Sequence, residues 1–283
     1  MFEFRRDLDP TATIASGTRC VIETEDAFSN QIAEHGDRRD LLSQPYGNPL
    51  TGPIAVDGAA PGDVVEIAIH DIAALGGAAS TYAYPTSSVV GYLGSDVVPQ
   101  DRRCQIDDSG IRWDDKLTLP YEPMIGTVGV LPPIGQPSTA ECGDWGGNMD
   151  LVEIGPGSIL ELPVFVSGAG LYFGDCHALQ GAAEWSGAAM EMRAAIDCTI
   201  AVRRTKAIPG PRILRDDSIF AVGVGRSIEA GIAQAYSRLA LWLEAEYGRE
   251  RWDGYCLLTQ VGRLSLGYHQ LGVVAAGIER RYL

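Results

Sequence analysis

The sequence predicts a mainly β protein with some α/β elements, built as two β-sandwich or barrel-like units with a C-terminal helical segment packed on them. Three observations favour this fold class. The 283 residues include 34 glycines and 16 prolines, which suit many tight turns. Several segments alternate apolar and polar residues, as half-buried strands do. One long segment near the C-terminus has the periodicity of an amphipathic helix.

Alternating apolar and polar side chains predict strands at residues 19–26 and 63–72. In the second strand Val65, Ile67 and Ile69 share one face, so His70 lies on the opposite face, where we expect it to be solvated. Further strands are expected at residues 159–166, 171–173, 191–202 and 218–223.

A Pro-Gly turn followed by an amphipathic strand occurs twice, at residues 61–67 and 156–162. The simplest account of this repeat is two similar β units. We therefore expect an N-terminal β unit with long loops over residues 1–140. A second β unit, which carries the candidate site and the C-terminal helices, covers residues 141–283; the two units interlock or form one domain. Residues 76–140 are expected to form long loops and short strands that cover the site.

The helical pattern begins at Ser227, a favourable N-cap, and ends before Gly248. Its apolar residues form one stripe, as in a helix that covers a sheet: Ile228, Ile232, Ala235, Leu239 and Leu243. A second helix is expected from residue 250 to about residue 260. We expect its inward side chains to be Trp252, Tyr255 and Leu258 or Thr259.

Composition and charge exclude several classes of partner. A formal net charge of -15 disfavours binding to nucleic acid and to anionic membranes, since either needs a basic patch. No apolar run approaches the ~18 residues of a membrane span, and the N-terminus lacks the apolar core of a signal peptide. Six cysteines without a C-x-x-C pair indicate reduced thiols. We therefore expect a cytoplasmic protein.

Several catalytic machineries are also disfavoured. A P-loop needs glycine directly before lysine, whereas Asp115 and Thr205 precede the two lysines. Neither G-x-G segment continues to the third glycine of a dinucleotide-binding motif. The chain also has no G-x-S-x-G elbow for a nucleophilic serine.

Residues 174–184, GDCHALQGAAE, place one of only four histidines beside two carboxylates. In an extended chain Asp175 and His177 project from the same face, where both can bind one divalent cation. Glu184 can return to the same place through a turn at Gly181, either as a third ligand or as the base that takes a proton from water. The same alternation points Cys176 away from His177, which disfavours a cysteine nucleophile.

A second dense stretch lies upstream, at residues 142–150, CGDWGGNMD. Its paired glycines allow close approach of the backbone. Asp144, Asn148 and Asp150 supply oxygen atoms of the kind that bind hard cations.

GGNMD at 146–150 and GDCHALQG at 174–181, together with NPLTGPIAVDGAAPGDVVEIAIHDI at 48–72, resemble the acetamidase/formamidase family. The resemblance covers roughly residues 15–275, in the family's order. It implies a mostly β, metal-dependent amidohydrolase that cleaves a short carboxamide into carboxylate and ammonia. Matching the motifs position by position points to a site of Asn148, Asp150, Asp175, His177 and Glu184.

Within that site, the resemblance favours all five residues as metal ligands, with His177 and Glu184 also catalytic. A histidine ligand favours zinc, whereas the oxygen-rich GGNMD segment would suit calcium or magnesium. The expected partners are a small amide substrate and further copies of the chain in a homodimer or higher homo-oligomer.

One departure from the family motif leaves alternatives open. The family usually continues as Gln-Gly-Asp-Gly-Glu, but Ala182 and Ala183 precede Glu184 here, so a ligand or an outer partner of the metal is missing. The first alternative is a noncatalytic β protein that binds a metal or a small ligand. The second is an amidase for a bulkier or cyclic amide, whose pocket is shaped by Trp145, Trp185 and Tyr172.

Overall fold

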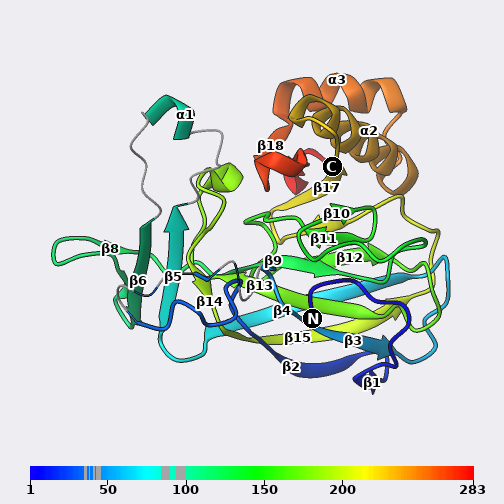
Figure 1. Ribbon diagram of the computed structural model, residues 1–283. Coiled ribbons are helices and arrows are strands. Elements are labelled where there is room, and N and C mark those ends of the chain that lie inside the picture. The colour runs from blue at the N-terminus through cyan, green and yellow to red at the C-terminus, as the bar shows by residue number, and fades with distance from the viewer. Residues whose placement is uncertain (35–36, 38, 41, 43–45, 84–89, 94–99) are drawn as a thin grey trace.

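The computed structural model describes residues 1–34, 37, 39–40, 42, 46–83, 90–93 and 100–283. Within this part of the chain, two β-sheets stack on one another and helices cover one end (Figure 1). The predicted mainly β fold class is therefore confirmed. Parts of the loop region expected at residues 76–140, namely residues 84–89 and 94–99, lie outside the described residues.

The first sheet has eight strands among the described residues, and its neighbouring strands pair antiparallel. Across the sheet the strands are β18 (Arg263–Leu266), β19 (Val273–Glu279), β17 (Ser218–Val224), β16 (Arg212–Leu214), β12 (Ile159–Pro163), β4 (Val64–Ala74), β15 (Ala194–Arg203) and β2 (Thr18–Thr24).

The second sheet has eleven described strands and contains the candidate site. Its main path is β10 (Cys142–Gly143), β11 (Gly146–Asn148), β9 (Met124–Gly129), β13 (Leu171–His177), β14 (Glu191–Met192), β5 (Ala78–Ala83), β6 (Gln100–Asp107), β7 (Gly110–Arg112) and β8 (Thr118–Leu119). Off this path, β3 (Leu50–Val56) pairs with β13 and with β1 (Ala12–Ile14).

Each segment predicted as a strand contains strand residues, with shifted bounds. The segment expected at 171–173 continues to His177, and all of β13 is buried. The segment expected at 191–202 divides at Arg193, because its first two residues join the second sheet as β14 and the rest form β15 of the first sheet. His70 is exposed, as expected, with Nε2 2.8 Å from Thr199 Oγ1.

The two Pro-Gly turns lead into strands that lie side by side in one sheet. β4 and β12 pair antiparallel, and Glu66 lies opposite Glu161 in the register. Both sheets take strands from each side of residue 140, so the segments 1–140 and 141–283 are interleaved. The division into two units at that residue stays a prediction.

The C-terminal helices are α2 (Ile228–Tyr247) and α3 (Arg251–Val261). The side chain of Ser227 caps α2 by accepting a hydrogen bond from the backbone N–H of Ala230, and Gly248 ends the helix in a left-handed conformation. The expected inward face of α3 was wrong in part. Leu258 is buried, but Trp252 and Tyr255 are 68% and 61% exposed, because α3 lies on α2 and not on a sheet.

Among the described residues, three short helices connect strands: α1 (Val90–Leu93) and the 3-10 helices η1 (Ala182–Glu184) and η2 (His269–Leu271). A further 3-10 helix, η3 (Arg280–Tyr282), follows β19. The largest apolar cluster takes side chains from both sheets, including Ile67, Val128 and Phe173. A smaller cluster joins α2 to β17 and β19. None of the described helices is long and apolar enough to cross a membrane.

Candidate functional site

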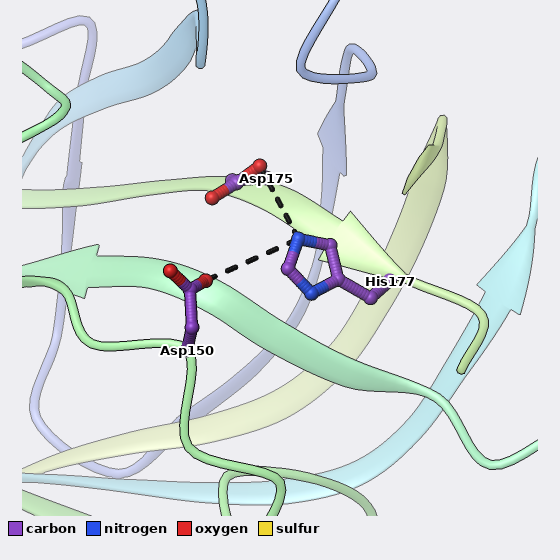
Figure 2. Close-up of side chains that lie close together, drawn as sticks. All are labelled: Asp150, Asp175 and His177. Carbon is purple, nitrogen blue, oxygen red and sulfur yellow. Dashed lines mark hydrogen bonds and ion pairs between the residues drawn. The ribbon is translucent and has the colours of Figure 1, made fainter. Parts of the chain in front are cut away.

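The site forms where β9, β13 and β14 meet. His177 ends β13 and is fully buried. The antiparallel register of β13 and β14 sets Glu191 directly opposite His177. Figure 2 shows Asp175, from the same strand, and Asp150, from the loop after β11, with their carboxylates directed at the imidazole ring of His177.

The ring nitrogen Nε2 of His177 is surrounded by carboxylate oxygens. It lies 3.2 Å from Glu191 Oε2, 3.4 Å from Asp175 Oδ1 and 4.0 Å from Asp150 Oδ1. Two overlapping groups of residues bring their ligand atoms close enough to hold one ion: Asp150, Asp175 and His177, and His177, Glu184 and Glu191.

The close approach of Asp150 and Asp175 depends on Gly126 in β9. A Cβ atom at position 126 would lie 2.5 Å from Asp150 Oδ1 and 2.8 Å from Asp175 Oδ2. Asp150 is held there by its backbone N–H, which donates to the carbonyl oxygen of Gly126 at 3.2 Å. A glycine at this position therefore makes room for both acidic side chains.

Three of the acidic residues have a left-handed backbone, with φ values of 49° for Asp150, 56° for Asp175 and 46° for Glu184. Non-glycine residues avoid this region, at a cost of about 1–3 kcal/mol each, and persist there only where the surroundings impose it. Such strain is concentrated at functional sites. Here it occurs at three of the four acidic residues of the cluster.

Polar neighbours hold the outer oxygen of Asp175. Its Oδ2 accepts a hydrogen bond from Asn48 Nδ2 at 2.9 Å and lies 3.0 Å from Thr127 Oγ1. The same two residues face the side-chain oxygen of Asn148, at 3.3 Å from Asn48 Nδ2 and 2.8 Å from Thr127 Oγ1. Asn148 lies at the edge of the cluster, with its carbonyl oxygen engaged by these donors.

Glu184 ends η1, and the C-terminal part of the chain holds this turn. The Nδ1–H of His269 donates to the carbonyl oxygen of Ala183 at 2.8 Å, and the rings of His269 and Trp185 stack with centroids 4.7 Å apart. Glu184 is 9% exposed and lines a cavity of about 280 Å³ together with Asp150, Asp175 and Glu191.

Burial and neighbouring charges shift the pKa values of Glu191, Asp150, Glu184 and His177. It raises the pKa of Glu191 to about 7, and burial followed by repulsion from Asp175 raises that of Asp150 well above its usual range. Burial and the charge of Asp150 do the same to the pKa of Glu184. For His177, burial lowers the pKa, but the facing carboxylates of Glu191 and Asp175 outweigh it and raise that pKa well above its usual value.

The donor set fits a divalent cation. Asp150 Oδ1 and Glu191 Oε2 are buried without a hydrogen-bond partner, although both face the same imidazole nitrogen. Buried carboxylates that lack donors are strongly destabilising unless a positive charge compensates them. Carboxylate oxygens with one imidazole nitrogen are ligands that zinc and other divalent metals accept.

A family model described as the acetamidase/formamidase family matches residues 3–139 and 135–220. The chain belongs to the acetamidase/formamidase family. Family membership supports a hydrolase that acts on amides, as the sequence motifs had indicated. None of the curated proteins that were compared matches the chain.

Solved structures of acetamidases share this fold over the full chain. An acetamidase from Yersinia enterocolitica is 32% identical, with a TM-score of 0.91 and 89% of its own chain covered. An acetamidase from Bacillus halodurans is 28% identical, with a TM-score of 0.92 and 95% covered. A gamma lactamase from Delftia acidovorans is 19% identical over 98% of this chain and 87% of its own, with a TM-score of 0.64, and shares the fold alone.

Two residues of the sequence motifs, Asp144 and Cys176, lie outside the acidic cluster. Asp144, expected as an oxygen ligand, is exposed and paired with Arg238 at 2.5 Å. Cys176 points away from the cavity: it is buried, its Sγ lies 3.6 Å from Thr24 Oγ1, and burial raises its pKa to about 12. A thiol in this state is a poor nucleophile, as expected.

The two alanines that replace the family's usual residues differ in position. Ala182 is exposed. Ala183 is buried, and its carbonyl oxygen accepts the hydrogen bond from His269. The Ala182 side chain does not line the cavity of the acidic cluster. That the missing carboxylate at 182 removes a ligand or an outer partner of the metal stays a prediction.

Sequence reasoning missed Glu191. It was expected only as the first residue of a strand, and its site role comes from the pairing of β14 with β13. The segment Ala188-Ala189-Met190-Glu191-Met192 carried a usable signal, since a lone carboxylate within a buried apolar run needs a partner of opposite charge.

Proposed function

We propose that the protein is a metal-dependent amidase that hydrolyses a short carboxamide to a carboxylate and ammonia. The observation that carries this proposal is the buried cluster of four acidic side chains around one imidazole nitrogen, at the wall of a small cavity. Family membership and the acetamidase structures support the same reaction class.

In this proposal His177 Nε2 and the carboxylates of Asp150, Asp175 and Glu191 hold the cation, and Asn148 acts as a further ligand. Zinc is the preferred metal because of the imidazole ligand, with calcium or magnesium as alternatives for the oxygen atoms. The bound cation polarises the amide carbonyl and makes water more acidic.

Glu184 is proposed as the general base and acid. It lines the cavity, and burial raises its pKa. A carboxyl group with a raised pKa can take a proton from water and pass it to the leaving nitrogen. Ammonia leaves an amide poorly without that proton. His269 and Trp185 keep the Glu184 turn in place for this transfer.

The cavity favours a small substrate. Its volume of about 280 Å³ is just below the range of ~300–1,000 Å³ usual for drug-sized ligands. Ala27, Phe28 and Ala140 supply apolar parts of its wall, which suit a short acyl group. Of the three aromatic residues considered for a bulkier amide, Tyr172 is fully buried against Phe4, and neither it nor Trp145 or Trp185 lines this cavity.

A noncatalytic binding protein is the rival. The strained backbone at Asp150, Asp175 and Glu184 favours catalysis over that rival. A metal that only stabilises the fold needs no strained acidic residue such as Glu184 at the wall of a cavity.

We also propose a homo-oligomer. Its support is an apolar groove on α2 and α3, where Leu241, Trp252 and Tyr255 are exposed. Sedimentation of the purified protein gives the oligomeric state, and a monomer at micromolar concentration would refute this part.

One experiment decides between the amidase and its rival. Protein purified without chelator is assayed for metal content and for ammonia release from formamide, acetamide and larger amides. We expect at least about one divalent ion per chain and ammonia from a short amide, lost in Asp175→Asn, His177→Ala and Glu184→Gln. Glu122→Gln, which removes an exposed carboxylate, is the matched control and should keep full activity. Metal without ammonia from any amide would favour the binding protein.

A further inference from the structure

Gln180 links the two segments that bring acidic residues to the site. Its side-chain Nε2 donates a hydrogen bond to the backbone carbonyl oxygen of Asp150 at 2.6 Å. Its Oε1 lies 2.8 Å from His177 Nδ1. One half-buried amide therefore bridges the loop after β11 and the end of β13.

The direction of this chain of hydrogen bonds follows from chemistry alone. A backbone carbonyl can only accept, so the Gln180 atom that faces Asp150 must be the NH₂ group. The other amide atom, which faces the imidazole, is then the oxygen. Because that oxygen can also only accept, Nδ1 of His177 must carry a hydrogen.

A hydrogen fixed on Nδ1 decides what the other ring nitrogen can do. When the imidazole is neutral, as a metal ligand must be, a hydrogen on Nδ1 leaves Nε2 with its lone pair toward the space bounded by Asp150, Asp175 and Glu191. The carboxylates 3.2 to 4.0 Å away favour a positive charge at Nε2, which a proton supplies in the metal-free protein and a divalent cation would supply in its place. The arrangement thus favours a cation on Nε2.

We propose that Gln180 is the positioning residue that sets the tautomer and ring orientation of His177 for metal binding. This inference rests on the proposed metal-dependent function and adds the residue that prepares the imidazole ligand. The Gln180 amide also ties the Asp150 backbone to the same ring, so the two ligand-bearing segments keep one fixed spacing.

The test compares zinc affinity, measured by competition with a chromophoric chelator, across three proteins and a control. Gln180→Met keeps an unbranched side chain of similar length but can neither accept from Nδ1 nor donate to Asp150. We expect it to bind zinc about 10- to 100-fold more weakly than the wild type. Gln180→Glu keeps an oxygen that accepts from Nδ1, so its affinity should lie clearly above that of Gln180→Met.

Gln234→Met controls for the loss of an ordinary glutamine hydrogen bond. The side-chain oxygen of Gln234 accepts from the backbone N–H of Val224 at 2.7 Å, away from the site, so this variant should lose stability but keep wild-type zinc affinity. Thermal unfolding of the metal-free variants separates the two effects. If Gln180→Met does not fold, nitrogen NMR of His177 in the zinc-bound wild type still tests the inference, because zinc on Nδ1 and not on Nε2 would contradict it.

The outcomes separate this inference from the proposed function. A wild type that takes up no metal overturns both. A wild type that binds zinc while Gln180→Met binds within twofold of it overturns the role of Gln180 and leaves the amidase proposal standing. Weaker binding in Gln180→Met with partial recovery in Gln180→Glu supports the inference.

Discussion

Gly126 and Asp150 are in such close contact that a single added carbon would separate them: a Cβ atom at position 126 would stand 2.5 Å from Asp150 Oδ1. The same carbon would lie 2.7 Å from the carbonyl oxygen of Asp175. The spacing of the acidic cluster therefore depends on a residue that has no functional group of its own.

Gly126→Ala should lower metal affinity at least about tenfold, because the new methyl group pushes apart the two carboxylates that share the cation. Metal titration of purified variants measures this. Gly181→Ala is the matched control. Gly181 precedes the turn that carries Glu184, its φ of -82° suits any residue, and a Cβ atom there meets nothing within 4 Å. Equal losses in both variants would mean that the effect is not specific to the cluster.

The stability of the metal-free protein should fall as the pH rises from about 5 to about 8. Burial raises the pKa of Glu191 to about 7 from an ordinary 4.5, and the pKa of His177 is also raised. Groups that hold protons more tightly in the folded state stabilise it below their unfolded pKa values, and this contribution is lost as the pH rises through the folded values.

Added divalent metal should reverse this trend, because the ligands must be deprotonated to bind it. Thermal unfolding of chelator-treated protein across this pH range, with and without added metal, measures how stability changes with pH in both states. Glu191→Gln should flatten the metal-free slope. A metal-free protein that grows more stable toward pH 8 would contradict the expected sign.

A third prediction concerns the strained backbone of Glu184, whose φ is 46°. Glu184→Gly should make the metal-free protein about 1 kcal/mol more stable than Glu184→Ala, because glycine adopts the left-handed region without penalty. At a position of ordinary backbone the order is reversed. Urea denaturation of both variants makes the comparison, and both should lose amidase activity. A Glu184→Ala variant at least as stable as Glu184→Gly would show that no strain is stored there.

His269→Phe should lower kcat about tenfold while leaving metal content unchanged. Phenylalanine keeps a ring to stack on Trp185 but cannot donate to the carbonyl oxygen of Ala183, so the turn that carries Glu184 loosens. His70→Phe, at an exposed histidine of β4, controls for the substitution itself and should have full activity. A fall in metal content in parallel with kcat would instead mean that His269 supports the whole cluster.

Ala182→Asp should leave metal affinity within about twofold of the wild type, since an exposed carboxylate acts only weakly through water. The family's usual residue would thus add nothing to this cluster. A marked rise in affinity would show that position 182 reaches the metal after all, and the same titration used for Gly126→Ala detects it.

Local patterns in the sequence predicted what local physics controls. Asp175 and His177 lie together as the alternation predicted, although the backbone of Asp175 is left-handed and not extended. The capping serine and the terminal glycine marked both ends of α2. What the sequence could not reveal depends on pairing between distant segments. Glu191 reaches His177 only because β14 pairs with β13, and α3 exposes Trp252 because it packs on another helix.

The roles of Gly126 and Gln180 are also hard to predict from sequence, because they too depend on contacts between distant segments. A glycine within a strand is usually interpreted as a weak point, and its value here is the space that it leaves for side chains from two other segments. Gln180 is three residues from His177 in the sequence, but its second partner is the backbone of Asp150, which no side-chain pattern can indicate.

The pairing of β4 with β12 has a consequence for the repeated Pro-Gly strands. When a segment pairs antiparallel with its own repeat, the register can bring one residue opposite its own counterpart, across a local twofold axis. Here that residue is glutamate, and Glu66 opposes Glu161. Two like charges in that position repel, and Arg203, which lies outside both repeats, contacts both carboxylates. Arg212 lies 3.8 Å from Glu161 as well. The two glutamates of the repeat therefore differ in their surroundings: Glu161 is buried between two arginines, whereas Glu66 is partly in water.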